Sequence, residues 1–285
     1  MSGQPDLLML LEKACLRAGR KVMRSYRQEA FKVDQKRRAD PRTVVSEADL
    51  ESEREVFTVF RPALHCGFVS EEAGSLRGES GYRVIVDSLD GSKNFVERNF
   101  GLFAVSVAVE LAPRIEAGAV YLPYFGDLVA AQRGRGVFRN GRPVQAPASG
   151  RAARQLKYAR LCIARGGAEP AAMSRRPLSD LLGGCADTLN YGSCAMGMTA
   201  VALGCVDAFV MPAQKYWDLA AGWRILRELG VPVGIWKNGW RERLSERQLT
   251  QATDKDLLDV AAAGTSPLFR QISRILKTGD SPRVS

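Results

Sequence analysis

The stretch Val84-Ile-Val-Asp-Ser-Leu-Asp-Gly-Ser-Lys-Asn-Phe95 does most to decide how this chain folds. It opens with an apolar run typical of a buried strand, and Asp87 stands at the C-terminal end of that run. Asp90 follows, and Gly91-Ser92 then favours a turn into a short helix, whose free N–H groups bind phosphate well. Because Mg²⁺ takes hard oxygen ligands, the two carboxylates and the Leu89 carbonyl could hold a pair of such ions. A plain turn with a helix cap would leave the same pattern, so this stretch alone leaves both interpretations open.

Three further acidic positions each allow a catalytic and a purely structural interpretation. Glu71-Glu72 follows the strand expected over 67–70, and acidic pairs at strand ends are usually solvated. Asp49 lies in register with Ser46 for a helix capping box. Asp218 precedes an apolar helical run and could be an ordinary N-cap. Their joint occurrence with the two carboxylates above argues for a single site.

The composition is that of a globular protein with one large or two closely packed domains: 285 residues, 46% hydrophobic and 25% charged. No apolar run approaches the roughly 20 residues that cross a bilayer. The N-terminus lacks the basic-then-apolar layout of a secretory signal. We therefore expect a cytoplasmic protein with no membrane partner.

Histidine and cysteine usage restricts the chemistry. A lone His65 cannot complete a Cys/His zinc cluster, and it is the one candidate for a His-based triad, so catalysis must use carboxylates, hydroxyls or metals. No C-x-x-C pair occurs. Reduced and mostly buried thiols are expected, with a disulfide left open, at Cys15, Cys66, Cys162, Cys185, Cys194 and Cys205.

The net charge of +10 suits an anionic partner. Basic residues gather in one segment, but no aromatic side chain that could stack on a base is interleaved with them. A solvated loop is therefore favoured over a nucleic-acid site there. The segment contains Lys32, Lys36, Arg37, Arg38 and Arg42.

Hydrophobic periodicity gives the expected order of elements. Asn140-Gly141 is the strongest hairpin signal in the chain, between strands over 137–139 and 143–145. Antiparallel signals dominate before residue 148 and alternating strands and helices follow it, so a domain boundary is placed there. The tail over 276–285 is expected to fray. Helices are predicted over 6–27, 47–60, 177–183, 194–203 and 219–229, and further strands over 67–70, 83–87, 104–110, 117–121, 128–133, 156–164 and 206–211.

Together these residues resemble the inositol monophosphatase family, whose superfamily includes fructose-1,6-bisphosphatases and bisphosphate nucleotidases. The family's D-P-I/L-D-G-T/S signature appears as Asp87-Ser-Leu-Asp-Gly-Ser92, and its W-D-x-A-A-G signature as Trp217-Asp-Leu-Ala-Ala-Gly222. The resemblance runs over about residues 5 to 230 in the family's order. Shorter matches are Ser46-Glu-Ala-Asp49, Ser70-Glu-Glu72, Gly134-Arg-Gly-Val-Phe-Arg-Asn-Gly141 and Gly192-Ser-Cys-Ala195.

The resemblance implies a layered αβαβα sandwich. Its N-terminal α+β half, 1–148, would carry the metals and phosphate, and its C-terminal α/β half, 149–285, would complete the substrate site. The implied activity is Mg²⁺-dependent hydrolysis of an inositol monophosphate or a related sugar or polyol phosphate, by a homodimer. Alternatives are a fructose-1,6-bisphosphatase, a 3′(2′),5′-bisphosphate nucleotidase, or a non-catalytic member that binds RNA or RNA polymerase. The basic charge permits the last, whereas intact metal ligands argue against it.

The resemblance also implies a ligand set for two or three Mg²⁺ ions. Glu71 and Asp87, with the Leu89 carbonyl, would hold the first ion. Asp87, Asp90 and Asp218 would hold the second. A third, weaker ion would sit near Glu71, which is expected to be a catalytic residue as well as a ligand.

The remaining roles concern water, phosphate and substrate. Ser92, with Asp49 behind it, would orient and deprotonate the attacking water, and the Gly91 and Ser92 amides would hold the phosphate. Two departures from the family pattern stand out: Ser88 replaces proline and should loosen the loop, and Met211 stands where animal inositol phosphatases carry a glutamate that contacts inositol. The substrate side is instead expected to be lined by Gly192, Ser193, Cys194 and Lys215.

Overall fold

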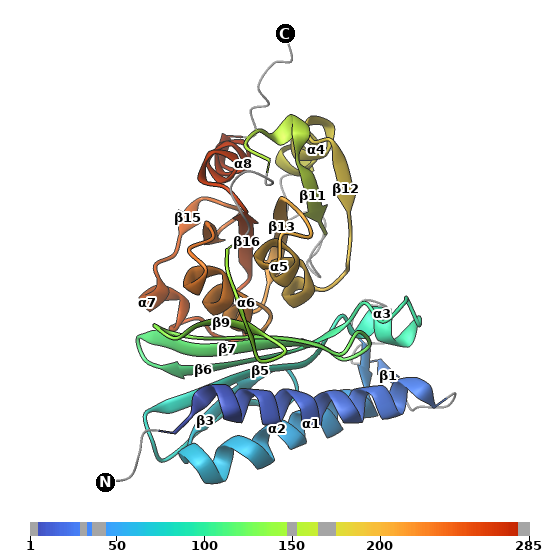
Figure 1. Ribbon diagram of the computed structural model, residues 1–285, viewed down its shortest axis with the longest axis vertical. Coiled ribbons are helices and arrows are strands. Elements are labelled where there is room, and N and C mark those ends of the chain that lie inside the picture. The colour runs from blue at the N-terminus through green and yellow to red at the C-terminus, as the bar shows by residue number, and fades with distance from the viewer. Residues whose placement is uncertain (1–4, 29–32, 36–43, 147–152, 165–174, 279–285) are drawn as a thin grey trace.

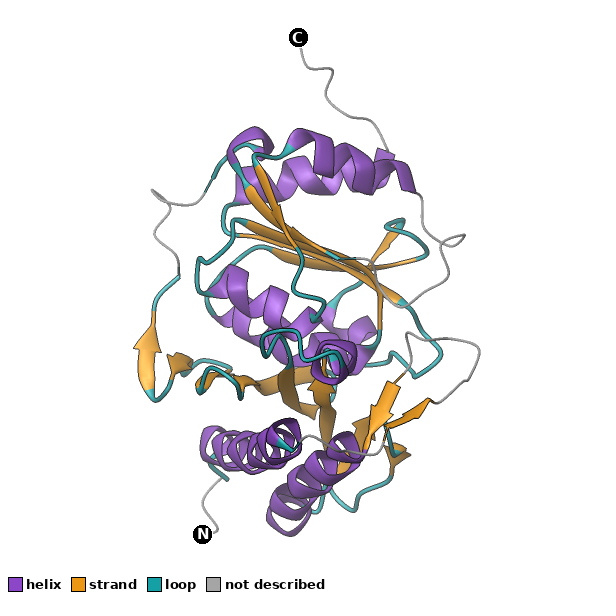
Figure 2. Ribbon diagram, turned by 90° about the vertical axis from the view of Figure 1, so that its right-hand side faces the viewer, coloured by secondary structure: helices purple, strands orange, loops and turns teal. Residues whose placement is uncertain are grey.

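The computed structural model describes residues 5–28, 33–35, 44–146, 153–164 and 175–278. These residues form five stacked layers, in which helix layers alternate with two mixed sheets (Figures 1 and 2). The layered αβαβα sandwich expected from the sequence is therefore confirmed. The helices are α1 (Leu7–Arg27), α2 (Glu47–Leu64), α3 (Ser92–Val96), α4 (Arg175–Gly184), α5 (Cys194–Ala202), α6 (Tyr216–Glu228), α7 (Glu246–Leu249) and α8 (Ser266–Thr278).

The first sheet has the strand order β10-β9-β8-β7-β6-β5-β3-β4, and a separate two-stranded sheet pairs β1 with β2. β3 pairs in parallel with β5, and the other neighbours in the eight-stranded sheet are antiparallel. The predicted hairpin at Asn140-Gly141 joins β9 to β10, with φ angles of 49° and 76° that suit a type I′ turn. The strands are β1 (Val33–Gln35), β2 (Val44–Ser46), β3 (Gly67–Ser70), β4 (Gly74–Leu76), β5 (Tyr82–Asp90), β6 (Ala104–Leu111), β7 (Arg114–Leu122), β8 (Asp127–Gln132), β9 (Gly136–Arg139) and β10 (Arg142–Val144).

Helices α1 and α2 cover one face of this sheet, and α5 and α6 lie on the other (Figure 1). Buried residues recur every three or four positions along α1, which gives that helix an apolar stripe to pack on the strands. Val84 and Val86 of β5 enter the core beneath α1 and α2, whereas Ile85 enters the core on the opposite face. Because side chains alternate along a strand, Asp87 points to the same side as Ile85, toward the central helices.

The second sheet has the strand order β12-β11-β13-β16-β14-β15 and lies between the central helices and an outer layer of α4 and α8 (Figure 2). β11 pairs in parallel with β12 and β13, and the other pairs are antiparallel. Its strands are β11 (Arg160–Ile163), β12 (Asp187–Leu189), β13 (Ala208–Gln214), β14 (Val233–Lys237), β15 (Glu242–Arg243) and β16 (Leu258–Ala263).

Several expected boundaries in the second half were wrong. The strand expected over 156–164 is a 3₁₀ turn, Leu156–Tyr158, followed by the shorter β11. The helix expected from 219 begins at Tyr216, because Asp218 supports its first turn from inside. The tail expected to fray from 276 starts too early, since Leu276 is buried in the core beneath α8. The proposed boundary at residue 148 falls outside the described residues.

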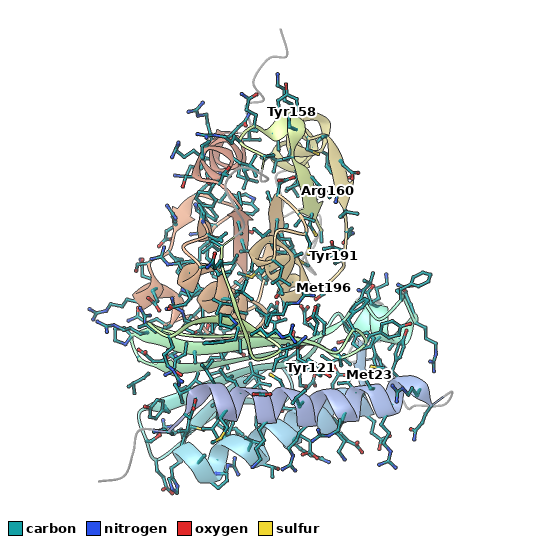
Figure 3. All side chains as sticks on the ribbon, viewed as in Figure 1. Met23, Tyr121, Tyr158, Arg160, Tyr191 and Met196 are labelled. Atoms are coloured by element: carbon teal, nitrogen blue, oxygen red, sulfur yellow. The ribbon has the colours of Figure 1, made fainter. Side chains whose placement is uncertain are left out.

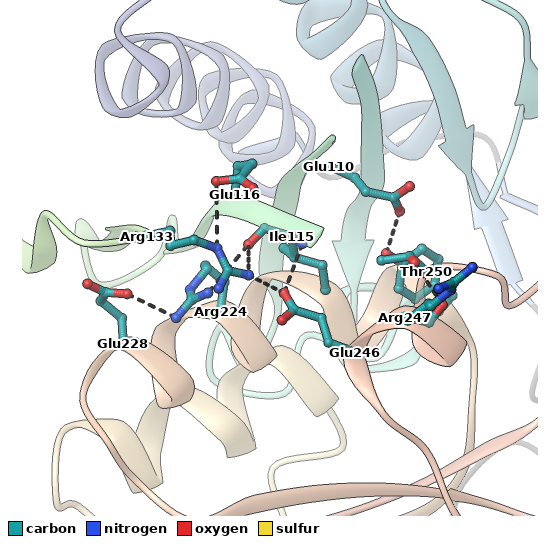
Figure 4. Close-up of polar contacts among 10 residues, drawn as sticks. Glu110, Ile115, Glu116, Arg133, Arg224, Glu228, Glu246, Arg247 and Thr250 are labelled. Atoms are coloured by element: carbon teal, nitrogen blue, oxygen red, sulfur yellow. Dashed lines mark hydrogen bonds and ion pairs between the residues drawn. The ribbon is translucent and has the colours of Figure 1, made fainter. Parts of the chain in front are cut away.

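Two polar groups fasten the first sheet to the helices of the second half (Figure 4). Arg133 pairs with Glu246 of α7, and the same carboxylate accepts the N–H of Ile115 at 3.0 Å. Arg224 of α6 pairs with Glu228 at 2.9 Å, and Glu228 accepts the N–H of Gly134 at 2.8 Å. The two halves are thus joined by paired charges as well as by an apolar core.

None of the helices in the described ranges combines the length and apolar character needed to span a bilayer. All six cysteines are unpaired, and four of them are buried. The thiols therefore contribute to packing in this fold and do not cross-link it.

Candidate active site

The C-terminal end of β5 carries two carboxylates on a β-bulge. Asp87 pairs with Ser106 of β6 but Asp90 with Ala104, so β5 has one residue more than β6 over this step. Without the extra residue, two positions three apart would point to opposite faces of the sheet. The Leu89 N–H donates to Asp87 Oδ1 at 3.0 Å and holds the bulge in place. As a result, two nearly buried carboxylates, 3% and 8% exposed, lie close enough to repel one another.

Gly91 then turns the chain from β5 into α3. Its φ of 92° lies in the left-handed region that favours glycine. A Cβ atom at this position would also lie 2.8 Å from the carbonyl oxygen of Leu102. The turn into a short helix predicted at Gly91-Ser92 is therefore confirmed.

Asp49, on the first turn of α2, lies behind the bulge and is held there by hydroxyl groups. Ser92 Oγ is 3.2 Å from Asp49 Oδ1 and 2.9 Å from the Leu89 carbonyl, so one hydroxyl proton is shared between two acceptors. Ser88 Oγ donates to the Asp49 carbonyl at 2.9 Å. The expectation that Ser88 would loosen this loop did not allow for that bond to α2. Ser52 Oγ reinforces it at 3.2 Å from the Ser88 carbonyl.

Asp218 reaches the same region from the first turn of α6. Its Oδ2 accepts the N–H of Lys215 at 2.8 Å. Lys215 is the N-cap and Asp218 is the third residue of the helix, so the N-cap role considered for Asp218 from the sequence was wrong. Ser106, which lies opposite Asp87 in the sheet, donates its hydroxyl to the Trp217 carbonyl at 3.3 Å. This hydrogen bond fixes the start of α6 to β6, the strand that pairs with the bulged end of β5.

Glu71 arrives from the neighbouring strand. β3 runs parallel to β5 with Ser70 opposite Val86, so Glu71 follows beside Asp87. The Glu71 N–H donates to the Val86 carbonyl at 3.3 Å, and its side chain is exposed. The carboxyl ends of two parallel strands therefore bring two sequence-distant carboxylates together.

These acids carry more negative charge than their surroundings balance. Burial raises the pKa of Asp87 well above its usual range, and the charges of Glu71, Asp90 and Asp218 raise it further. Burial and the charges of Asp90 and Glu71 likewise raise the pKa of Asp218. In the described part of the chain, no lysine or arginine forms an ion pair with Asp87, Asp90 or Asp218. A site of this kind is stabilised by added positive charge.

A divalent cation that keeps part of its water shell fits this donor set. Among the described residues, no three His, Cys, Asp or Glu side chains are gathered closely enough to hold an ion by themselves. Mg²⁺ is commonly bound by only one or two carboxylates together with waters and substrate phosphate oxygens. The buried, mutually repelling carboxylates match that chemistry.

Two residues expected to line the substrate side, Ser193 and Cys194, are buried beside Asp90 instead. Ser193 Oγ and the Ala195 N–H each donate to Asp90 Oδ2 at 2.6 Å. Ser193 is 1% and Cys194 0% exposed, so neither side chain faces an open substrate side. Gly192 is exposed, and Figure 3 shows the flanking Tyr191 and Met196 directly above the first sheet.

The other substrate-side expectations have mixed outcomes. The Lys215 ammonium donates to the Asp254 carbonyl, so it is held at the edge of the second half. Met211 is 7% exposed and packs in the core. The basic segment over 32–42 lies outside the described residues, apart from the short strand β1.

Glu53 is a nearby carboxylate that the sequence interpretation missed. It is 4% exposed and accepts the N–H groups of Glu72 at 3.3 Å and Ala73 at 3.1 Å, which shapes the chain just after Glu71. Burial raises its pKa. The available signal was helical spacing. Glu53 lies four residues after Asp49 and three before Val56, so it shares the buried face of α2 with both.

Residues 6–266 match the inositol monophosphatase family. The chain belongs to that family. An inositol-1-monophosphatase from Mesorhizobium japonicum is 33% identical, with 79% of this chain and 83% of the relative aligned.

Two further similar proteins carry the name SuhB. The Nus factor SuhB of Escherichia coli K12 is 31% identical over 82% of this chain and 86% of its own. The crystal structure of the extragenic suppressor protein suhB from Bartonella henselae superimposes with a TM-score of 0.80 at 28% identity, covering 96% of this chain and 99% of that one. The family is phosphatase-type, and it includes members named for another role.

Proposed function

We propose that this protein is a Mg²⁺-dependent phosphomonoesterase that hydrolyses an inositol monophosphate or a related sugar or polyol phosphate. The observation that carries the proposal is the meeting of Asp87, Asp90 and Asp218 at the end of β5 without a basic partner among the described residues. Family membership and the resemblance to an inositol-1-monophosphatase support it.

In this proposal the carboxylates hold two or three Mg²⁺ ions. Glu71, Asp87 and the Leu89 carbonyl would bind one, and Asp87, Asp90 and Asp218 a second, with a third near Glu71. When bound, such ions lower the pKa of a coordinated water and neutralise phosphate charge. The hydrogen bonds that Ser193 and Ala195 donate to one oxygen of Asp90 leave its other oxygen available and fix its direction.

The remaining residues would handle the proton and the phosphate. Ser92 Oγ accepts a proton from the attacking water as it passes its own to Asp49 Oδ1, 3.2 Å away. The water oxygen forms a bond to phosphorus, the ester P–O bond breaks, and the alcohol leaves with a proton from solvent. The N–H groups of Gly91 and Ser92 would hold phosphate oxygens during this exchange.

Substrate range follows from the substrate side. Met211 is buried and apolar, so it offers no partner for a polyol hydroxyl. Discrimination would then rest on phosphate position and shape, through Gly192 and Lys215. Apolar and shape contacts produce differences of roughly 10- to 200-fold, whereas a dedicated hydrogen bond can reach about 10⁴-fold. Several substrates should therefore be hydrolysed with kcat/KM within about 100-fold of one another.

The test is phosphate release from inositol 1-phosphate, fructose 1,6-bisphosphate, glycerol 2-phosphate and adenosine 3′,5′-bisphosphate, each with Mg²⁺ and with EDTA. We expect release that requires Mg²⁺ and a shallow ranking of substrates. A preference above about 10⁴-fold for one compound would mean that a buried polar group of the protein hydrogen-bonds that compound. The homodimer and the cytoplasmic location stay predictions, and sedimentation of the purified protein tests the former.

A non-catalytic role in binding RNA or RNA polymerase is the second candidate. It is favoured by the 31% identity to the Nus factor SuhB and by the formal charge of +10. A folded protein that releases no phosphate from any of the four compounds with Mg²⁺ would support this role over the phosphatase.

A further inference from the structure

A second charged surface lies along the outer face of α1, on the layer that faces away from the second half of the molecule (Figure 1). It is a groove of about 630 Å³, which we call the α1 groove. Its lining includes one apolar side chain, Leu16, and one acid, Glu55. The rest of the lining is basic: Lys13, Arg17, Arg20, Lys21 and Arg24.

Only part of this positive charge is balanced. Arg17 pairs with Glu55 of α2 at 2.7 Å, and Lys21 lies 3.6 Å from Glu51. Lys13, Arg20 and Arg24 are exposed, and no carboxylate in the described ranges pairs with them. The pairs anchor one wall of the groove to α2, and the other three cations are available to a ligand.

The spacing of the three available cations points to an extended ligand. They occupy positions i, i+7 and i+11 of one helix, which places the first and last about 17 Å apart along its axis. A single phosphate group contacts cations one turn apart, about 5–6 Å. An anion that uses all three must carry several charges in a row.

The character of the lining selects among extended anions. None of the residues that line the groove is aromatic, so unpaired bases find nothing to stack on. Leu16 is the single apolar residue of the lining, which gives a membrane surface no row of side chains to receive. A duplex presents its phosphates outward, where lysine and arginine side chains can bind them without any contact to the bases.

We propose that the α1 groove binds the phosphodiester backbone of a double-stranded nucleic acid, independently of base sequence and of the carboxylate site. The interaction goes beyond the proposed phosphatase activity and leaves the catalytic residues untouched. RNA and DNA duplexes share this chemistry, so both are used as probes.

The experiment measures binding of the full-length protein to labelled RNA and DNA duplexes of about 20 base pairs over a range of salt concentrations. The test variant is Arg20→Glu/Arg24→Glu. The matched control is Arg270→Glu/Lys277→Glu, which removes the same formal charge from exposed positions on α8 in the opposite outer layer. Far-ultraviolet circular dichroism and a thermal melt of each protein report whether it is folded.

We expect the test variant to bind at least about 10-fold more weakly and to lower the slope of log K against log salt by about two, one for each lost phosphate contact. The control should change affinity by less than about 3-fold, and both variants should keep wild-type phosphate release. If the test variant does not fold, Lys13→Gln/Arg20→Gln removes two groove charges without reversing them.

Four outcomes would overturn the proposal. Equal weakening by the control would mean that net charge alone drives binding. Displacement of the duplex by excess inositol 1-phosphate would assign binding to the carboxylate site. Binding to anionic vesicles or to single strands but not to duplexes would assign the groove to another partner. Wild-type protein that binds no duplex even at low salt would leave the groove without this role.

Discussion

Strand β5 has buried charged groups at both of its ends. At one end the buried charge is paired with an opposite charge, and at the other it is not. At its start, Arg83 donates to Glu110 Oε1 through Nε at 3.0 Å and Nη2 at 2.7 Å, and Tyr216 Oη donates to Oε2 at 2.7 Å. Arg83 Nη2 also reaches the Thr250 carbonyl at 2.6 Å. At its other end the bulge gathers carboxylates that repel one another and have no basic partner among the described residues.

The contrast separates a structural charge from a functional one. Glu110 is 0% exposed, yet both of its oxygens are bonded, so its charge is satisfied within the protein. Asp87 is as deeply buried but faces like charges. Burying a carboxylate beside like charges destabilises the fold unless a bound cation offsets the repulsion. One turn of α6 serves both ends, since Tyr216 bonds Glu110 and Asp218 approaches Asp87.

The largest expected effect is at Asp90. In Asp90→Asn the amide oxygen can still accept the Ser193 and Ala195 donors while one repelling charge is lost. We expect metal-free melting at or above the wild-type temperature, with kcat lower by about 10³-fold, equivalent to roughly 4 kcal/mol of transition-state stabilisation. Phosphate release measured beside a thermal melt checks both. Activity within about threefold of wild type would end the ligand assignment.

At the other end of β5 the same kind of change should act on stability instead. Arg83→Met leaves Glu110 buried without its main partner, and we expect a loss of about 3 kcal/mol in the free energy of unfolding, as for other broken buried pairs. Urea unfolding measures the loss, and kcat per folded molecule should stay close to wild type.

A double variant sharpens that result. Adding Glu110→Gln removes the stranded charge, so Arg83→Met/Glu110→Gln should recover part of the lost stability. If the two single losses simply add, the pair is not the satisfied unit described above.

A smaller effect distinguishes catalysis from capping at Asp49. A water-orienting residue replaced by alanine should lower kcat by on the order of 10²-fold. Asp6 is the matched control, because it caps α1 by accepting the N–H groups of Leu8 at 3.1 Å and Met9 at 3.3 Å. Asp6→Ala should cost about 1 kcal/mol of stability and leave kcat unchanged. If Asp49→Ala behaves in the same way, its bond to Ser92 has no catalytic role.

Local pattern predicted much of this arrangement. The apolar run before Asp87, the glycine turn and the Asn140-Gly141 hairpin are set by neighbouring residues, and all three have the predicted form. The layered fold was inferred from motif order through a family resemblance. Periodicity alone could not tell the 3₁₀ turn at 156–158 from a strand, because short apolar runs suit both.

Long-range contacts were beyond such reasoning. The bulge depends on register between β5 and β6, and the bond from Tyr216 to Glu110 joins residues 106 positions apart. The direction of Ser193 depends on its place at the start of α5, where its hydroxyl turns to Asp90. The Gly192-Ser-Cys-Ala195 motif therefore placed Ser193 near the site but did not predict its hydrogen bond to Asp90.

The most direct test of the unbalanced site is a calorimetric titration of metal-free protein with Mg²⁺, for wild type and Asp87→Asn. The charge of Asp87 interacts with those of Glu71, Asp90 and Asp218. We expect that wild type binds at least two ions per chain and that Asp87→Asn, with an amide in place of the shared carboxylate, loses this binding. Identical isotherms for the two proteins, or no binding of Mg²⁺ by wild type, would contradict it.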